Sequence, residues 1–540
     1  MKTIATVAVD LERSPLGTRS RLADDLRGKP VLRRTVERLL RARRLDAIHV
    51  LTPARQARAA AQVLTNLDVR METHSEPSVG YAGLVRAGRV WGLDGWRGGI
   101  GSVCAFDEDL HLPLVAALAE RESAAVVVSI PAAAAVIDAA LIDAMIDHHA
   151  EQTGDTRLTI IQAPPGLGLV ILDRTLLAQM APTQQPIGVI LTYRPDQPVP
   201  DLTGKPACYR PPVAVVEARG RLLCDTRRAF ERVEALLNAG GDDWDAERIA
   251  GWLLQREATH VADVPEEIEI ELTTTDASGS GSILHPRGDR VGTRGPISLD
   301  LIRAVIDGLT GYDDVRIVLG GFGDPCTHPA FGEICRMFRA SDAMAIAVRT
   351  DATVEAAPVE AALFETPVDV VEVTIDAACA ETYRRVWGSD RLAEVSSRIE
   401  RWIERRFAGN SVLPLIVPSL VKANESLPDM EPFFDAWMRR LGMVLVTGYS
   451  HCAGQLERRA VTAMAPQKSD ACRRTFSRLL VLADGTVTTC DQDFAGRQSV
   501  GSLRDAPLVD LWRSERLSRI RRNDIDSLPL CPTCDEWHRP

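Results

Sequence analysis

Cysteines carry the clearest chemical signal in this sequence. The chain has eleven of them among 540 residues, and five lie within residues 451–540. Cys531 and Cys534 form a CxxC, while Cys472 and Cys490 flank a predicted hairpin with an Asp-Gly turn. The end of a hairpin and a CxxC turn can bring four thiolates into a tetrahedral arrangement. Such a site suits a zinc ion or an iron–sulfur cluster, and the spacing alone leaves both open.

The remaining cysteines are expected to be free thiols. Cys452 lies ahead of the four and is predicted to stay unligated, with a role as fifth ligand as the alternative. The other six stand singly, which is typical of buried structural thiols. They are Cys104, Cys208, Cys224, Cys326, Cys335 and Cys379.

The segment from Cys472 to Trp537 resembles the SPASM domain, which follows the core of many radical SAM enzymes. The resemblance rests on Cys472, LLVLADGTVTTCDQD, the VGSLRD turn, LVDLWRS and LPLCPTCDEW, in that order. In that family the cysteines hold an auxiliary [4Fe-4S] cluster. The resemblance implies one such cluster here, because the cysteines for a second one are absent. Its implied ligands are Cys472, Cys490, Cys531 and Cys534.

Residues 265 to 450 resemble the partial barrel of the radical SAM family. The motifs are GGFGDP (320–325), RTDAT (349–353), VEVTIDA (371–377) and the ETYRRVWG that follows. Glycines let a ligand approach the backbone closely, and carbonyl oxygens accept hydrogen bonds from an ammonium group. The resemblance therefore implies a pocket for S-adenosylmethionine (SAM). The residues it assigns to that pocket are Gly320, Gly321, Gly323, Asp324 and Asp376.

The same segment departs from the family at the loop that should hold the SAM-cleaving cluster. The family has CxxxCxxC there, whereas this chain has ELTTTDASGSGSILHPR at 271–287. Serine hydroxyls stay protonated near neutral pH and are poor iron ligands, so we expect no radical initiation. Ligation by Asp276, His285 or a cysteine from elsewhere in the chain is the open alternative. The two alignments of the cysteine positions give Ser278, Ser282 and His285, or Asp276, Ser280 and Ile283.

Residues 1–240 resemble nucleotidyltransferases of the sugar- or cofactor-cytidylyltransferase kind. The resemblance rests on the opening strand, SRL (20–22), GKP (28–30), a helix, and a strand followed by Thr. It implies a nucleotide site with Mg²⁺, although the opening loop lacks the repeated glycines of active members. SIPAAAAVID (129–138) also stands where an acidic metal ligand is usual. The implied residues are Arg19, Arg21 and Lys29 for phosphate, and Asp107 and Asp109 for the metal.

Alternating strand and helix patterns predict an α/β protein whose parts position these sites. An N-terminal nucleotidyltransferase-like (GT-A-type) α/β sandwich is expected at 1–240, and a helix with a linker at 241–264. A radical SAM-like partial (β/α) barrel follows at 265–450, and a small Cys-rich SPASM domain at 451–540. Strands are expected at 3–9, 47–51, 125–130, 158–162, 188–193, 268–272, 315–319, 345–348, 368–375 and 412–417.

Composition and charge restrict the partners. The formal net charge of −11 disfavours a general electrostatic grip on nucleic acid or an anionic membrane. The sequence shows neither an export signal nor a spanning segment, so we expect a cytoplasmic protein. The small-molecule or protein partner is left open.

Three functions follow from the sequence, in order of preference. The first is an iron–sulfur protein of the radical SAM/SPASM type with a redox, scaffold or regulatory role. The second is a nucleotidyltransferase for sugar-nucleotide or surface-glycan biosynthesis. The third is a radical SAM enzyme whose cluster has non-thiolate ligands.

Overall fold

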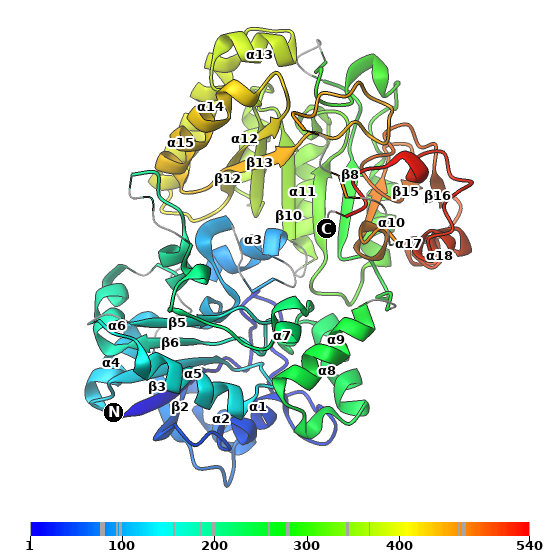
Figure 1. The fold of residues 1–540 in the computed structure, drawn as a ribbon. Helices are drawn as coiled ribbons and strands as arrows, with labels where there is room; N and C mark the ends of the chain where they lie inside the picture. Colours follow the sequence, from blue (N-terminus) through cyan, green and yellow to red (C-terminus); the bar gives the residue numbers. More distant parts are fainter. Residues whose placement is uncertain are drawn as a thin grey trace. The chain divides into compact units, whose positions relative to one another are not determined.

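The protein divides into two compact units, which we describe separately (Figure 1). Unit 1 comprises Met1–Tyr193 and Gln197–His260, and unit 2 comprises Arg194–Asp196 and Val261–Pro540. The structure, a computed structural model, describes residues 2–75, 82–92, 95–96, 100–154, 157–183, 185–196, 198, 201–257, 260–276, 281–341, 345–366, 368–462, 465–466 and 471–538.

Unit 1 is built on a seven-stranded sheet with the strand order β3-β2-β1-β4-β6-β5-β7. Strands β1 to β4 run parallel to one another, whereas β6 is antiparallel to both β4 and β5. The strands are β1 (Thr3–Ala8), β2 (Ala47–Pro53), β3 (Arg70–His74), β4 (Val126–Pro131), β5 (Leu158–Ile161), β6 (Val170–Asp173) and β7 (Cys208–Tyr209).

Helices cover both faces of this sheet. In β1, Ala5 and Val7 pack in the cluster that includes Val36 of α1, whereas Ile4 packs on the other face with Leu118 of α4. This alternation makes β1 a fully buried central strand. The helices of unit 1 are α1 (Val31–Leu39), α2 (Ala57–Val63), α3 (Ala82–Gly92), α4 (Leu112–Arg121), α5 (Ala139–Glu151), α6 (Arg174–Met180), α7 (Val213–Glu217), α8 (Arg227–Asn238) and α9 (Ala246–Glu257).

Unit 2 contains a nine-stranded sheet with the order β13-β12-β11-β10-β9-β8-β14-β15-β16. The six strands β8 to β13 are parallel and follow one another in chain order, with helices in between, as in part of a (β/α) barrel. The strands are β8 (Glu267–Glu271), β9 (Arg316–Gly320), β10 (Ala345–Thr350), β11 (Val370–Thr374), β12 (Leu415–Lys422), β13 (Leu445–Gly448), β14 (Arg478–Val481), β15 (Thr486–Thr488) and β16 (Ser499–Ser502).

The helices of unit 2 pack their apolar faces on this sheet. In α10, for example, Ser298 caps the N-terminus by accepting a hydrogen bond from Leu301 N, and Ile302 and Val305 are buried. The helices are α10 (Leu299–Gly308), α11 (Phe331–Ala340), α12 (Ala357–Phe364), α13 (Ala380–Trp387), α14 (Leu392–Ala408), α15 (Met430–Leu441), α16 (Arg474–Ser477), α17 (Leu508–Trp512) and α18 (Glu515–Arg521).

Strand β8 shows how the sheet of unit 2 separates apolar from charged side chains. Ile268 and Ile270 lie in the hydrophobic core, while the three glutamates of the EIEIE sequence are also buried. Each glutamate is compensated by an arginine, which offsets the cost of burying a charge. The ion pairs are Glu267 with Arg316, Glu269 with Arg349 (3.1 Å), and Glu271 with Arg294 (2.6 Å).

The predicted α/β fold class is confirmed, and so are most of the expected strands. The exception is 188–193, which was expected to be a strand: Ile187–Leu191 forms a 3₁₀ helix (η5) instead. Strands β3, β6, β7 and β13 were not predicted. None of the described helices combines the length and apolar character that a membrane span requires.

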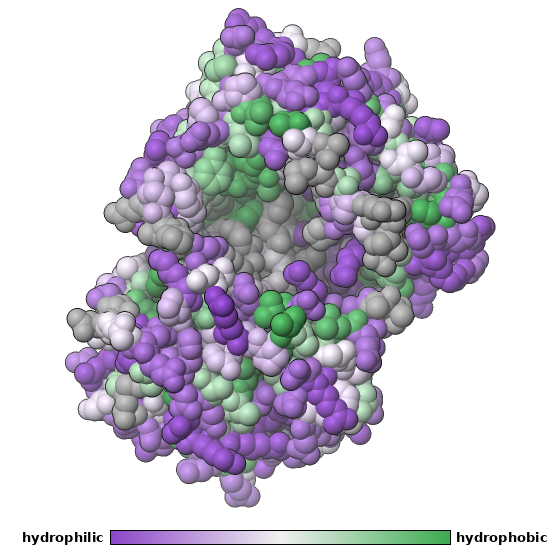
Figure 2. All heavy atoms as spheres, viewed as in Figure 1, coloured by the Kyte–Doolittle hydropathy of each residue, from purple (hydrophilic) through white to green (hydrophobic). Residues whose placement is uncertain are grey.

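The face shown in Figure 2 is mostly hydrophilic. A small apolar patch lies over α7, where the side chains of Val213 and Val216 are exposed. Single exposed valines are common on soluble proteins, so the patch itself indicates no ligand.

Candidate functional site

Four cysteines of unit 2 are positioned by one hairpin and one short turn. Strands β14 and β15 pair antiparallel; Cys472 precedes α16, which leads into β14, and Cys490 lies just beyond the end of β15. Cys531 opens the 3₁₀ turn η11 (Cys531–Thr533), and Cys534 follows it. The structure thus places the predicted ligands on the two elements that the sequence assigned to them.

The surroundings of these thiols disfavour their ionised form. Burial raises the pKa of the Cys490 thiol well above its usual range, and the charge of Cys472 adds to the effect. Burial also raises the pKa of Cys534 to about 11, with additions from Cys472 and Cys531. Gathering thiolates here is therefore unfavourable unless a cationic group binds them.

Polar groups of neighbouring residues point at these sulfurs. The side-chain amide of Gln498 donates from Nε2 to Cys531 Sγ at 2.9 Å, and the backbone N–H of Glu536 donates to Cys534 Sγ at 3.4 Å. Arg474 Nη1 donates to Asp491 Oδ1 at 2.5 Å, next to Cys490. Hydrogen bonds to ligand sulfurs are what iron–sulfur sites use to stabilise bound clusters.

Cys452 lies beside this group. Its thiol is buried, its pKa is raised to about 12 mainly by burial, and the charge of Cys534 contributes. Residues around it bond to the ligand loops: Thr533 Oγ1 donates to Ala453 O at 2.9 Å. The loop that carries Cys452 therefore lines the four-cysteine site.

The glycine-rich turn after β9 packs against the end of β8. A Cβ on Gly321 would lie 2.6 Å from Glu271 Cβ, and one on Gly323 would lie 2.4 Å from Thr273 O. At Gly320 the nearest atom, Arg349 Cβ, would be 3.3 Å away. Gly321 and Gly323 are therefore required by the packing of the fold itself, whatever ligand binds nearby.

The two predicted aspartates of the SAM pocket are buried and engaged with other residues. Asp324 accepts hydrogen bonds from Thr350 Oγ1 and Cys326 N, both at 2.8 Å. Burial and the neighbouring Asp351 raise its pKa well above the usual range. Asp376 has a φ of +61°, accepts from Val421 N at 2.8 Å, and is fully buried.

The loop after β8 meets this pocket through His285. His285 Nε2 lies 2.7 Å from Asp376 Oδ2, and its ring stacks on Trp387 with a centroid separation of 5.5 Å. Ser282 Oγ accepts from Leu284 N at 3.2 Å, as in a local serine turn. Ser278, the third predicted position, lies outside the described residues.

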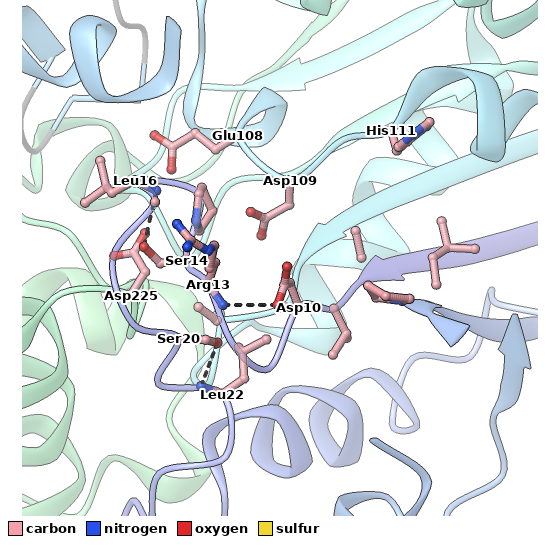
Figure 3. A pocket seen from close by; sticks show the side chains of 18 of the residues that line it. Asp10, Arg13, Ser14, Leu16, Ser20, Leu22, Glu108, Asp109, His111 and Asp225 are labelled. Carbon is pink, nitrogen blue, oxygen red and sulfur yellow. Dashed lines mark hydrogen bonds between the residues drawn. The ribbon is translucent and has the colours of Figure 1, made fainter. Parts of the chain in front are cut away.

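Unit 1 contains a cavity of about 790 Å³ at the ends of β1, β2 and β4 (Figure 3). Of the predicted nucleotide-site residues, Arg21 and Asp109 line it. The other three lie elsewhere in unit 1. Arg19 pairs with Asp24 (2.6 Å), Lys29 pairs with Glu37 (2.6 Å), and Asp107 accepts hydrogen bonds from the backbone N–H groups of Cys104, Ile187 and Gly188.

Three carboxyl groups gather at one wall of this cavity. Glu108, Asp109 and Asp225 line it together, and Arg221 pairs with Glu108 and with Asp225 (2.6 Å). Burial, then the charges of Glu108 and Asp225, raise the pKa of Asp109 to about 7. The carboxyl groups of this wall are thus partly neutralised by Arg221.

The sequence did not single out Glu108 or Asp225. Glu108 lies between two predicted aspartates, and Asp225 follows a short apolar run, so neither stands out by pattern. Their role depends on contacts across the fold. Arginines complete the lining and would attract a negatively charged ligand: Arg13, Arg21, Arg55 and Arg86.

Comparison with known proteins identifies the cysteine-rich segment. Residues 472–535 match the SPASM family, described as an iron–sulfur cluster-binding domain. This confirms the resemblance seen in the sequence. The chain therefore carries an iron–sulfur cluster-binding domain in this segment.

Similarities over longer stretches are weaker. An uncharacterized protein from Treponema pallidum (strain Nichols) is 25% identical over 248 residues, 44% of this chain and 68% of that protein. Streptococcus suis SuiB bound to precursor peptide SuiA shows 11% identity, with 57% of this chain and 82% of that chain covered, and a TM-score of 0.41. A cytidylyltransferase from Leptospira borgpetersenii serovar Hardjo-bovis (strain JB197) shows 14% identity, with 47% and 93% covered, and a TM-score of 0.33. None of these similarities assigns an activity to this chain.

Proposed function

We propose that the protein binds one [4Fe-4S] cluster through Cys472, Cys490, Cys531 and Cys534, and that it serves a redox, scaffold or regulatory role without cleaving SAM. The observation that carries the proposal is the match of residues 472–535 to an iron–sulfur cluster-binding domain, since this segment contains all four cysteines.

The match to an iron–sulfur cluster-binding domain favours a cluster over zinc, because four cysteine ligands alone would suit either group.

The loop after β8 lacks cysteine ligands for a SAM-cleaving cluster. The sequence has no cysteine between Cys224 and Cys326, so the loop after β8 supplies no thiolate. His285, one of the residues considered as a substitute ligand, lies 2.7 Å from Asp376 Oδ2 through its Nε2 and stacks on Trp387. Its contacts fit a structural role within the pocket.

The test is iron and acid-labile sulfide per chain after anaerobic purification and reconstitution. We expect about four irons, which a Cys531→Ala/Cys534→Ala variant loses. Cys379→Ala is the matched control, because Cys379 is exposed at the N-terminus of α13 and lies outside the matched segment 472–535. One zinc and no iron would overturn the cluster assignment.

The absence of SAM chemistry has its own test. The reduced, reconstituted protein is incubated with SAM, and 5′-deoxyadenosine is measured. We expect none above the level of the Cys531→Ala/Cys534→Ala variant. About eight irons per chain together with 5′-deoxyadenosine would show a second cluster and radical chemistry.

A second candidate function, nucleotide binding and nucleotidyl transfer in unit 1, rests on the cavity. Its carboxyl wall suits Mg²⁺ and its arginines suit phosphates. The test is NTP-dependent release of pyrophosphate with Mg²⁺. Arg21→Gln should abolish release, whereas Lys29→Gln should not, because Lys29 lies outside the cavity. Equal activity of both variants would contradict a nucleotide site here.

A further inference from the structure

Arg474 occupies an unusual place for a charged side chain. It is buried and lies two residues beyond Cys472 in the chain. Its hydrogen-bond partner Asp491 is next to Cys490. Glu536 Oε2 lies 3.9 Å from its Nη2, two residues beyond Cys534. Its guanidinium is therefore surrounded by residues that neighbour three of the four cluster-binding cysteines.

One N–H donor of this guanidinium lacks an acceptor among the described residues. Within the described residues, the Nε–H of Arg474 is buried and has no hydrogen-bond partner. Leaving such a donor unsatisfied costs roughly 1–3 kcal/mol, so buried donors normally have an acceptor. The sulfurs of a bound cluster and its cysteine ligands would supply one.

Gln498 offers a second, independent donor. Its side chain is buried, and Nε2 lies 2.9 Å from Cys531 Sγ. Among the described residues its Oε1 has no partner. A thiolate only accepts hydrogen bonds, so a cluster on Cys531 requires the N–H end of this amide to face the sulfur. The orientation seen here is the one that a ligated Cys531 needs.

We propose that Arg474 and Gln498 are positioning residues that set the reduction potential of the cluster, Arg474 by its buried positive charge and free N–H and Gln498 by its N–H···S hydrogen bond. The inference rests on the proposed cluster. Reduction adds one electron, supplied in the test by dithionite, and so one negative charge to the site. A nearby guanidinium and N–H dipoles stabilise that added charge in a poorly solvated environment.

The experiment is a mediated potentiometric titration of the reconstituted full chain, followed by EPR of the reduced cluster. We expect Arg474→Gln and Gln498→Leu each to shift the midpoint potential to more negative values. Arg474→Lys should shift it less than Arg474→Gln, because the charge is kept. Arg473→Gln is the matched control: Arg473 is exposed and adjoins Cys472, and its removal should leave the potential unchanged.

The outcomes separate this inference from the proposed function. If the reconstituted wild-type protein contains no iron, both the proposed cluster and this inference are overturned. Full iron content in all variants with equal potentials overturns the inference and leaves the cluster in place. If Arg474→Gln fails to hold iron, Gln498→Leu decides: a negative shift supports the inference, and an unchanged potential overturns it.

Discussion

Asp107 and Asp109 show how two similar residues acquire different roles from their contacts. Burial raises the pKa of both to about 7. Asp107 has no contact with the cavity; it joins Cys104 to the start of η5 through three backbone N–H groups. Asp109 lines the cavity, and its carboxyl group points into it (Figure 3). The motif AFDEDL indicates two candidates, and only long-range contacts distinguish them.

Replacing Asp107 should therefore affect stability and leave ligand binding intact. Asp107→Ala leaves three buried backbone N–H groups without their acceptor, which should lower the unfolding free energy by roughly 2–4 kcal/mol. The measurement is urea unfolding. Lys29→Ala, which removes an exposed ion pair, should cost at most about 1 kcal/mol. Equal losses for both would contradict the structural role of Asp107.

Replacing Asp109 should affect cation binding and its dependence on pH. A protonated carboxyl group is a poor ligand, so Mn²⁺ affinity at the cavity should rise as the pH rises from about 6 to about 8. Titration followed by EPR of free Mn²⁺ measures this. Asp109→Asn should bind weakly with little pH dependence over that range. Unaltered binding by the variant would place the cation elsewhere.

The glycine-rich turn between β9 and α11 illustrates what a motif reveals about an element. The sequence identified the turn correctly and suggested a ligand as its reason. The structure adds a packing reason, because Gly321 and Gly323 lie against the end of β8 with no room for a Cβ. A glycine-rich motif that resembles a ligand-binding turn can therefore also be explained by close packing of the backbone.

Gly321→Ala should consequently destabilise unit 2 more than a substitution at an equally left-handed glycine. Gly321 (φ +82°) would bring a Cβ within 2.6 Å of Glu271, whereas Gly292 (φ +72°) has nothing within 4 Å. The difference between the two variants isolates the steric clash, which we expect to cost about 1–3 kcal/mol. Denaturant unfolding measures both. Equal losses of unfolding free energy in the two variants would show that β8 moves to accommodate the added Cβ at no energetic cost.

Elements with a strong local pattern could be predicted, and those fixed by distant contacts could not. Five of the six parallel strands of unit 2 and the cysteine hairpin follow from apolar runs and turn residues, whereas β13 was not predicted. The run at 188–193 looks like a strand, but Asp107 holds Ile187 N and Gly188 N in the 3₁₀ turn η5. Strand β3 (RMETH) lacks an apolar alternation because it is an edge strand.

In unit 2 the cysteine-rich segment and the barrel share one sheet. Strand β14 pairs parallel with β8, with Leu479 opposite Ile268, although the sequence suggested separate domains on either side of residue 450. Charges continue across this pairing: despite its burial, Asp491 has a lowered pKa because of Arg474, Arg478 and Arg349. The four-cysteine site is therefore mechanically and electrostatically joined to the strands of the barrel.

Losing the cluster should for that reason loosen a defined part of the molecule. The binding free energy of a metal site is also folding free energy for the elements that hold it. In Cys531→Ala/Cys534→Ala, deuterium uptake should increase across 472–538 and along β8, while peptides of unit 1 exchange as in the wild type. Cys379→Ala, measured in the same way by mass spectrometry, should exchange like the wild type. Unchanged deuterium uptake across 472–538 in the double variant would contradict this prediction. It would mean that the segment keeps its structure without a cluster, and that the cluster does not stabilise β8.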